Sequence, residues 1–230
     1  MLFPDFHDRL AEVRERIAGA VQRGGHGQDV RLIAVTKTHG AEAVEAAWQA
    51  GVRDVGENKV QEALGKQPLV RGGAAAMRWH LIGHLQRNKV KGLEHFAVLH
   101  TIDSTRLADA VHEFGRLRGS AVEALVQVNA SGEETKGGYA VASMGAESGR
   151  FLQLTGIRVS GVMTMAPFNA DERTLRRVFE SARSARDVLV RSGLPARELS
   201  MGMSGDYEVA VEEGATMVRL GTVLFGARAQ

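Results

Sequence analysis

Lys37 is the residue of this sequence with the clearest potential for covalent chemistry. It follows the short apolar run Leu32, Ile33, Ala34 and Val35. A run this short and β-branched predicts a strand buried on both faces, so the ammonium would leave the core at the edge of a sheet. Partial desolvation there penalises the charged form and lowers the pKa, which makes the amine a nucleophile able to form a Schiff base with an aldehyde. The alternative is a lysine that ends the strand and points into water.

The elements that would position Lys37 alternate along the chain as short apolar runs and helical stretches. Strands are expected near residues 31–36, 53–56, 78–82, 98–102, 122–128, 157–163, 198–200 and 217–220. Helices are expected near residues 41–50, 59–69, 86–93, 105–117, 141–154, 171–191 and 206–213, with a last turn near 222–228. An opening amphipathic helix carries apolar residues at steps of three and four, namely Phe6, Leu10, Val13, Ile17 and Val21. The fold class is therefore α/β, a single (β/α)8 TIM barrel with an extra N-terminal helix. The rival is an open doubly wound sheet, but no Gly-x-Gly-x-x-Gly turn follows the first strand.

The composition fits one globular domain over residues 1–230. The chain is 44% hydrophobic and 24% charged, and it has no cysteine, which excludes disulfides, thiolate catalysis and cysteine-bound metal. Residues 1–17 carry acidic side chains and no long apolar run, and no segment is long enough to span a bilayer, so we expect a cytoplasmic protein without a signal peptide or a membrane partner. The formal net charge of +2 is nearly balanced, and the arginines of residues 171–191 are interspersed with acidic residues, as on a solvated helix face. No nucleic-acid partner is expected.

Small and hydroxyl side chains follow the last two predicted strands, at the rim where a barrel gathers its loops. Ser204 and Thr222 offer hydroxyls, and Gly205 and Gly221 leave room for an oxyanion against backbone N–H groups. Loops after strands seven and eight, beside helix N-termini, are the recurrent phosphate site of this architecture. The same residue types are common at helix caps and tight turns, so the pattern by itself leaves both interpretations open.

Other polar residues of the expected rim are less specific. Arg219 faces either the barrel lumen or the helix layer. A lumen-facing guanidinium needs an acceptor, which could be a pyridine nitrogen, and the alternative is a salt bridge to a neighbouring carboxylate. His80 and His84 have a metal-ligand spacing only on a helix, and their neighbours predict a strand, so no metal is expected. We expect His80 to face inward beside a ligand and His84 to cap a helix. Glu57 could act as an acid or base, and Lys136 is expected in a loop, where it is solvated or contacts an incoming ligand.

Six stretches carry a specific resemblance to one family. They are residues 34–39 (AVTKTH), 55–62 (VGENKVQE), 79–89 (WHLIGHLQRNK), 161–167 (GVMTMAP), 199–206 (LSMGMSGD) and 218–226 (VRLGTVLFG). The chain resembles, over nearly its whole length, the pyridoxal-phosphate homeostasis proteins, also called YggS-like, whose fold is related to the N-terminal barrel of alanine racemase. The resemblance implies that Lys37 binds pyridoxal 5′-phosphate as a Schiff base. For the rest of the cofactor it implies phosphate contacts from Ser204, Gly205, Gly221 and Thr222, a pyridine-nitrogen contact from Arg219, and ring contacts from Asn58, His80 and Met165.

Two positions depart from the family pattern beside the expected cofactor. Lys59 stands where the family often has an aromatic residue, and Gly40 stands where it often has proline. These departures change the wall beside the cofactor and leave the Lys37 anchor in place.

The expected function is storage, buffering or delivery of pyridoxal 5′-phosphate, with apo forms of enzymes that use this cofactor as candidate recipients. Alanine racemase resembles the chain only over the barrel and carries its opposite-face base in a second domain, whereas this sequence ends at Gln230, so little or no turnover is expected. One alternative is an amino-acid racemase that uses a single base or water. Another is a regulatory scaffold that senses the occupied barrel. The resemblance favours a monomer.

Overall fold

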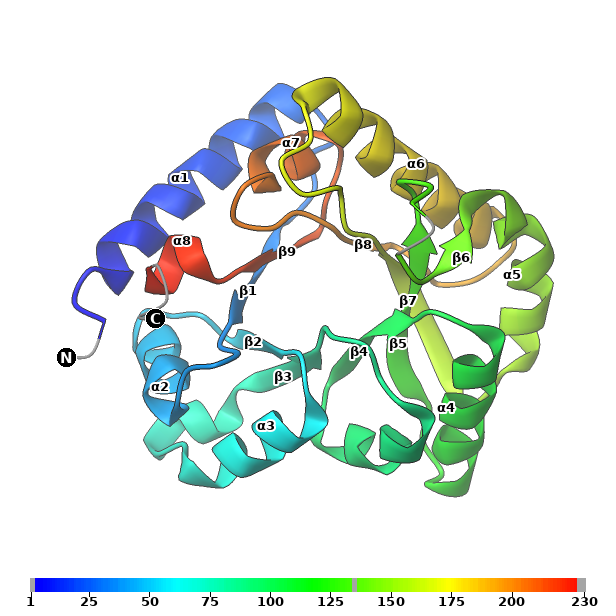
Figure 1. Ribbon diagram of the computed structural model, residues 1–230, viewed down its shortest axis with the longest axis horizontal. Helices are drawn as coiled ribbons and strands as arrows, with labels where there is room; N and C mark the ends of the chain where they lie inside the picture. The colour runs from blue at the N-terminus through cyan, green and yellow to red at the C-terminus, as the bar shows by residue number, and fades with distance from the viewer. Residues whose placement is uncertain (1–2, 134–135, 227–230) are drawn as a thin grey trace.

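The computed structural model describes residues 3–133 and 136–226, and within these ranges eight parallel strands close into a barrel. The barrel strands are β1 (Arg31–Val35), β2 (Asp54–Glu57), β3 (Arg78–Leu81), β4 (Val98–Ile102), β5 (Val122–Asn129), β7 (Ile157–Met163), β8 (Glu198–Ser200) and β9 (Met217–Leu220). Each pairs with the next in this order, and β9 pairs with β1 to close the ring. Figure 1 shows the ring with the helices outside it. The predicted (β/α)8 barrel is confirmed.

The helices cover the outer face of this ring. They are α1 (Phe6–Gly24), α2 (Ala41–Gln49), α3 (Val60–Lys66), α4 (Thr105–Leu117), α5 (Met144–Gln153), α6 (Glu172–Arg191), α7 (Tyr207–Glu212) and α8 (Thr222–Phe225). Short 3-10 segments lie between them, namely η1 (Gln67–Leu69), η2 (Gly72–Ala76), η3 (Arg87–His95) and η4 (Val141–Ser143). No described helix combines the length and the apolar character that crossing a membrane requires.

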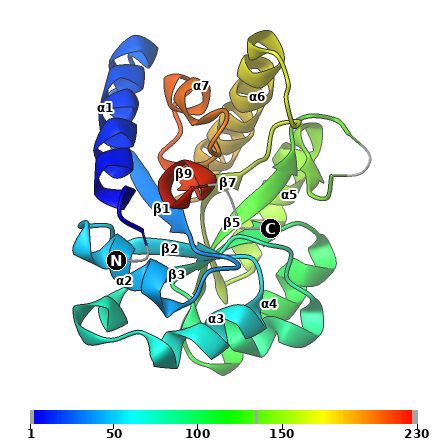
Figure 2. The ribbon, with the colours of Figure 1, turned by 60° about the vertical axis from the view of Figure 1, so that its left-hand side comes forward.

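The extra N-terminal helix α1 is present, as predicted, and packs against the outside of the barrel. Its residues Phe6, Leu10, Val13 and Ile17 are buried, because steps of three and four place them on one face of the helix. This face covers α7 and α8, and Figures 1 and 2 both show α1 beside α7. The N-terminal helix thus holds the two short helices that follow β8 and β9.

Ion pairs join α7 to both of its neighbouring helices. Arg23 of α1 reaches Glu212 at 2.5 Å, and Arg176 and Arg183 of α6 reach Glu212 and Glu213 at 2.5 and 2.9 Å. Arg176 and Arg183 belong to the set predicted to lie on a solvated helix face. Arg176 is still 40% exposed, whereas Arg183 is only 22% exposed and is not on a solvated face. The sequence pattern could not show that acidic residues at the end of α7 lie next to α6.

Some elements differ from the prediction, and one was predicted in part. The segment expected as a helix at 86–93 is the 3-10 segment η3, whose buried residues Val90 and Leu93 are three positions apart, the spacing that a 3-10 turn aligns. A two-residue strand, β6 (Tyr139–Ala140), pairs with the end of β5 and is too short to show a period. The predicted last turn begins as α8, and its residues 227–228 lie outside the described ranges.

Inward positions of the barrel strands repeat every two residues. On β1 they are Ile33 and Val35, and the same alternation brings Lys37 to the inner side of the rim. A Cβ added at Gly56 of β2 would lie 3.0 Å from Ile82 and 3.1 Å from Ile33, so glycine there lets these larger side chains fill the lumen. The apolar part of the lumen is a separate buried cluster made of Ile33, Val98, Leu125, Met163 and Met217. The strand alternation therefore decides which residues reach the barrel mouth.

Candidate functional site

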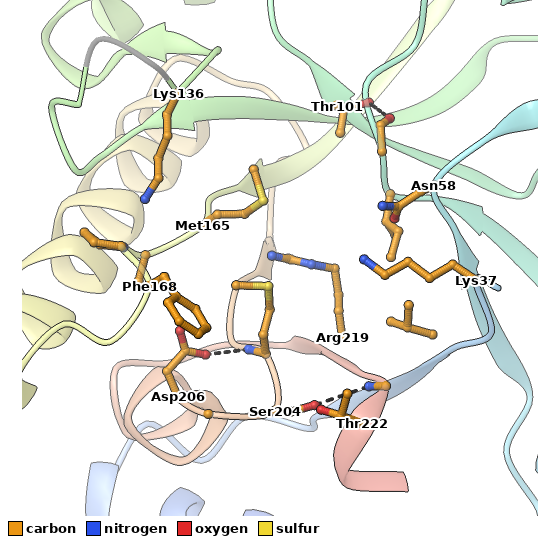
Figure 3. A pocket seen from close by; sticks show the side chains of 18 of the residues that line it. Lys37, Asn58, Thr101, Lys136, Met165, Phe168, Ser204, Asp206, Arg219 and Thr222 are labelled. Carbon is orange, nitrogen blue, oxygen red and sulfur yellow. Dashed lines mark hydrogen bonds between the residues drawn. The ribbon is translucent and has the colours of Figure 1, made fainter. Parts of the chain in front are cut away.

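A cavity of about 870 Å³ opens at the C-terminal ends of the barrel strands. Eight of the nine residues predicted to bind the ligand line it, and they are Lys37, Asn58, Met165, Ser204, Gly205, Arg219, Gly221 and Thr222. Figure 3 shows the side chains of Lys37 and Arg219 entering the middle of this cavity from different strands. Barrel closure thus gathers residues from both ends of the sequence into one site.

Charged side chains hold the backbone on both sides of Lys37. The Thr36 carbonyl accepts a hydrogen bond from Lys66 Nζ at 2.8 Å, and the Thr36 hydroxyl donates to Glu57 Oε1 at 2.6 Å. On the other side, the Thr38 N–H donates to Glu62 Oε1, and Thr38 has a φ of 69°, in the left-handed region that residues other than glycine rarely adopt. These contacts fix the direction in which the half-buried Lys37 leaves β1.

Glu57 and Lys66 form a buried ion pair beneath this strand end. Lys66 Nζ lies 2.5 Å from Glu57 Oε1, and the two side chains are 5% and 0% exposed. Burial raises the pKa of Glu57, although the hydrogen bonds from Lys66 and Thr36 oppose this effect. Glu57 does not line the cavity, so the structure gives it a part in holding the backbone instead of the acid or base role considered from the sequence.

The opposite side of the cavity is built from loop backbone and hydroxyl groups. Ser204 Oγ accepts long hydrogen bonds of 3.4 Å from the N–H groups of Gly221 and Val223, and so links the loops after β8 and β9. Gly205 and Gly221 leave free space, because a Cβ at Gly205 would meet nothing within 4 Å and one at Gly221 would meet Val35 only at ordinary contact distance. This side can therefore offer hydroxyl and N–H donors to an anion.

Asp206 is a lining residue that the sequence indicated only as a helix start. Its Oδ1 accepts a hydrogen bond of 2.5 Å from the Met203 N–H and shapes the loop after β8. Burial raises the pKa of Asp206, while the hydrogen bond from Met203 and the charge of Arg219 oppose this. A serine-glycine-aspartate sequence is a turn signal, and it could have indicated that this carboxylate supports the loop.

Arg219 lies at the floor of the cavity and is 4% exposed. Its Nη1 donates to Ser200 Oγ at 2.6 Å, and its Nη2 donates to the Thr164 carbonyl at 2.9 Å. Burial lowers the pKa of Arg219 to about 10, which still leaves the group charged at neutral pH. Of the two orientations that the sequence left open, the structure has the one that faces the lumen. Because a guanidinium has more N–H groups than these two bonds use, it keeps donors for a ligand.

His80 does not line the cavity, unlike the other eight residues. It is 1% exposed inside the barrel, where its Nδ1 lies 2.9 Å from His100 Nε2 and its Nε2 lies 2.8 Å from Asp54 Oδ1. As predicted, His80 faces the barrel interior, but the structure does not bring it to the cavity with the other eight residues. Strand alternation gives the side of the strand, whereas depth below the rim depends on the register of β3 against β2 and β4.

Several lining residues complete the mouth of the cavity. His84 Nδ1 lies 2.7 Å from Asp103 Oδ2, so the prediction that His84 caps a helix is wrong, and η3 begins after Gln86 instead. Phe168 is 93% exposed at the rim, and Lys136 enters from the loop after β5, as Figure 3 shows.

Within the described ranges, no cluster of three or more histidine, aspartate or glutamate side chains is arranged to hold a metal ion.

Comparison with known proteins agrees with this architecture. Residues 9–229 match the family described as alanine racemase, N-terminal domain. The pyridoxal phosphate homeostasis protein of Aquifex aeolicus is 39% identical over 224 residues, which cover 96% of this chain and 97% of that protein. The protein of the same name from Pseudomonas aeruginosa is 40% identical over 223 residues, covering 96% and 95%. The chain belongs to the alanine racemase N-terminal domain family and, within it, to the pyridoxal phosphate homeostasis proteins.

Solved structures of a relative show the same fold. The structure of PipY from Synechococcus elongatus without PLP has a TM-score of 0.86 and 36% identity, and covers 96% of this chain and 100% of that chain. The structure of PipY with PLP bound has a TM-score of 0.82 and 35% identity, with the same coverage. The family resemblance drawn from the six sequence stretches is confirmed.

Proposed function

We propose that this protein binds pyridoxal 5′-phosphate in the cavity at the barrel mouth, with its aldehyde carbon joined to Lys37 as a Schiff base. The observation that carries this proposal is the half-buried Lys37, which enters a cavity that also contains a buried arginine and a group of hydroxyl and N–H donors. A phosphorylated aromatic aldehyde needs these three partners. The names of the relatives and the PLP-bound PipY structure support the same cofactor.

The contacts proposed for the rest of the cofactor follow from the two sides of the cavity. The phosphate would lie against Ser204, Gly205, Gly221 and Thr222, where hydroxyl and N–H donors face free space. Arg219 would donate to the ring nitrogen and keep it unprotonated, because an arginine does not give up its proton. Asn58 and Met165 would contact the ring. When bound, the cofactor supplies a reactive aldehyde, and the protein binds, orients and shields it.

We propose further that the protein stores, buffers or delivers this cofactor in the cytoplasm, with little or no catalysis of its own, and that apo forms of enzymes that use it are the recipients. Transfer of labelled cofactor to an apoenzyme, compared with its release into buffer, tests delivery. Transfer faster than release supports delivery, and equal rates leave only buffering. The racemase alternative predicts α-proton exchange of an amino acid in deuterated water well above the rate with free cofactor. A panel of amino acids that shows no such exchange would refute this alternative.

The Schiff base has a direct test. Purified protein incubated with pyridoxal 5′-phosphate should show an aldimine absorption band that borohydride removes, and mass mapping should place the reduced adduct on Lys37. Lys37→Ala should abolish both signals. Lys59→Ala is the matched control, since Lys59 is exposed and does not line the cavity. An adduct on another lysine, or none, would refute the proposal.

A further inference from the structure

A continuous chain of buried polar side chains crosses the barrel lumen beneath Arg219. We call it the lumen relay, and it consists of Arg219, Ser200, His100, His80 and Asp54. The successive distances are 2.6 Å from Arg219 Nη1 to Ser200 Oγ, 2.9 Å from Ser200 Oγ to His100 Nδ1, 2.9 Å from His100 Nε2 to His80 Nδ1, and 2.8 Å from His80 Nε2 to Asp54 Oδ1. Each of these residues is at most 4% exposed.

The lumen relay joins strands that are not neighbours. His100 lies on β4 and Ser200 on β8, and two strands separate β4 from β8 one way around the ring and four the other way. Their hydrogen bond therefore crosses the interior of the barrel. Asp54 lies at the start of β2, where Arg78 Nη2 also donates to it at 2.8 Å. The relay thus runs from the floor of the cavity toward the opposite end of the barrel.

Polar side chains in this position are unusual for the architecture. The interior of such barrels is normally filled by bulky branched residues, as in the apolar lumen cluster that contains Ile33 and Leu125. A buried polar chain costs desolvation free energy unless each member finds a partner. Its presence beneath the cavity therefore points to a role in the site, which an apolar layer would not do. Here every member of the relay has partners on both sides.

The donors of the lumen relay can be ordered in one direction. Arg219 can only donate, so Ser200 Oγ accepts from it, and the Ser200 hydroxyl proton is then directed to His100 Nδ1. His100 is neutral, since burial holds its pKa well below the usual value. Its single proton is then on Nε2 and goes to His80 Nδ1, and His80 donates from Nε2 to the Asp54 carboxylate. The reverse order would leave the Ser200 proton without an acceptor among the hydrogen bonds of the described residues.

We propose that the lumen relay positions Arg219, so that Ser200, His100, His80 and Asp54 determine how its guanidinium presents the remaining N–H donors to a heteroaromatic nitrogen in the cavity. This inference rests on the proposed function and adds four positioning residues to it. Ser200 holds one edge of the guanidinium directly, and the two histidines hold the Ser200 hydroxyl in the orientation that accepts from Arg219. Asp54, as the terminal acceptor, fixes the direction of the whole chain.

The binding experiment uses two ligands that cannot form a Schiff base. One is 4′-deoxypyridoxine 5′-phosphate, and the other is its carbocyclic analogue with a C–H group in place of the ring nitrogen. The wild-type protein should bind the first more tightly by about tenfold or more, as one hydrogen bond from a charged donor provides. Ser200→Ala should remove most of this preference while binding of the carbocyclic analogue stays within about threefold, because the phosphate contacts are unchanged. His80→Leu should act in the same direction, and His80→Gln, which keeps a donor and an acceptor, should restore the preference.

Each outcome of the binding experiment has a definite meaning. A preference that survives in Ser200→Ala, or a loss of affinity that is equal for both ligands, would overturn the positioning role. Equal binding of the two ligands by the wild-type protein would overturn it as well. If the wild-type protein binds neither ligand, the proposed function fails.

A measurement on the ligand-free wild-type protein tests the proton order without any variant. Nitrogen-15 NMR of labelled histidine should find both His80 and His100 protonated only at Nε2. A proton on Nδ1 of His100 would overturn the proposed order even if the protein binds the cofactor. If neither ligand binds, the proposed function fails, and the NMR measurement still tests the proton order of the lumen relay. The proposed function and the lumen relay can therefore fail separately.

Discussion

The two sides of the cavity hold their functional groups by different physical means. On the side of Lys37, the strand end is fixed by a buried ion pair between Glu57 and Lys66. On the side of Ser204 and Gly221, the loops offer backbone N–H groups and hydroxyls, and their own links are long hydrogen bonds of 3.4 Å. The amine side therefore depends on individual buried charges, whereas the anion side depends on the course of the loops. A reactive amine must be held in one direction, while an anion is satisfied by several equivalent donors.

The largest effect is expected on the amine side from Lys66→Met. Removing the ammonium leaves the Glu57 carboxylate buried without its charged partner, which should lower the free energy of unfolding by about 3–5 kcal/mol. Urea unfolding measures this change. Lys59→Met is the matched control at an exposed position and should stay within about 0.5 kcal/mol. If Lys66→Met costs less than about 1 kcal/mol, the ion pair does not hold the strand end.

On the anion side, Ser204→Ala should affect affinity more than stability. The hydroxyl would be one of several donors to a phosphate, so its removal should weaken binding of pyridoxal 5′-phosphate by about 10- to 100-fold. Binding of pyridoxal, which lacks the phosphate, should change little. Titrations with both compounds measure the difference. An equal loss for pyridoxal and its phosphate would show that Ser204 acts only on the loop structure.

A pair of glycine substitutions compares the packing of the two sides. A Cβ at Gly83, on the amine side, would overlap the backbone of Asn58, so Gly83→Ala should destabilise the fold by about 1–3 kcal/mol. A Cβ at Gly205, on the anion side, meets nothing within 4 Å, so Gly205→Ala should change stability by about 0.5 kcal/mol or less. Thermal or urea unfolding compares the two variants. Similar losses in both would contradict the difference in packing.

The smallest effects concern pH and two carboxylates of β2. Burial alone would raise the pKa of Asp54, but hydrogen bonds from His80 and Arg78 outweigh it and leave the pKa below its usual value. The stability from Asp54 is therefore present above its unfolded pKa of about 3.9 and is lost as pH falls through the folded value. Glu57 has a raised pKa, so its contribution is complete below the unfolded value of about 4.3 and is lost as pH rises through the folded value.

Unfolding measured from pH 3 to pH 7 separates these two signs. As pH falls, the free energy of unfolding of wild type should move closer to that of Asp54→Asn. Over the same range, the free energy of unfolding of wild type should rise relative to that of Glu57→Gln. If the free energies of unfolding of the two variants change with pH in the same way, the pKa values of Asp54 and Glu57 are not shifted in opposite directions.

Much of the fold was predictable because the relevant signals are local. The apolar run before Lys37 and the βα period predicted the barrel and a lysine at its rim, whereas the sequence left the orientation of Arg219 open. The motifs around Ser204 and Gly221 predicted the loops of the anion side. The 3-10 form of η3 was not predictable, because apolar residues three positions apart also fit an α-helix. The two-residue β6 is too short to show a period.

The sequence by itself determined the order of strands and helices, the family, and the residue types at the barrel mouth, because neighbouring residues and their periods determine these features. The tertiary structure alone decided that His80 lies below the cavity, that His100 meets Ser200 across the lumen, and that Lys66 reaches the backbone of Thr36. These contacts join residues 26 to 100 positions apart in the chain. They depend on strand register and ring closure, which set the depth and the partners of each side chain, and no local pattern in the sequence contains that information.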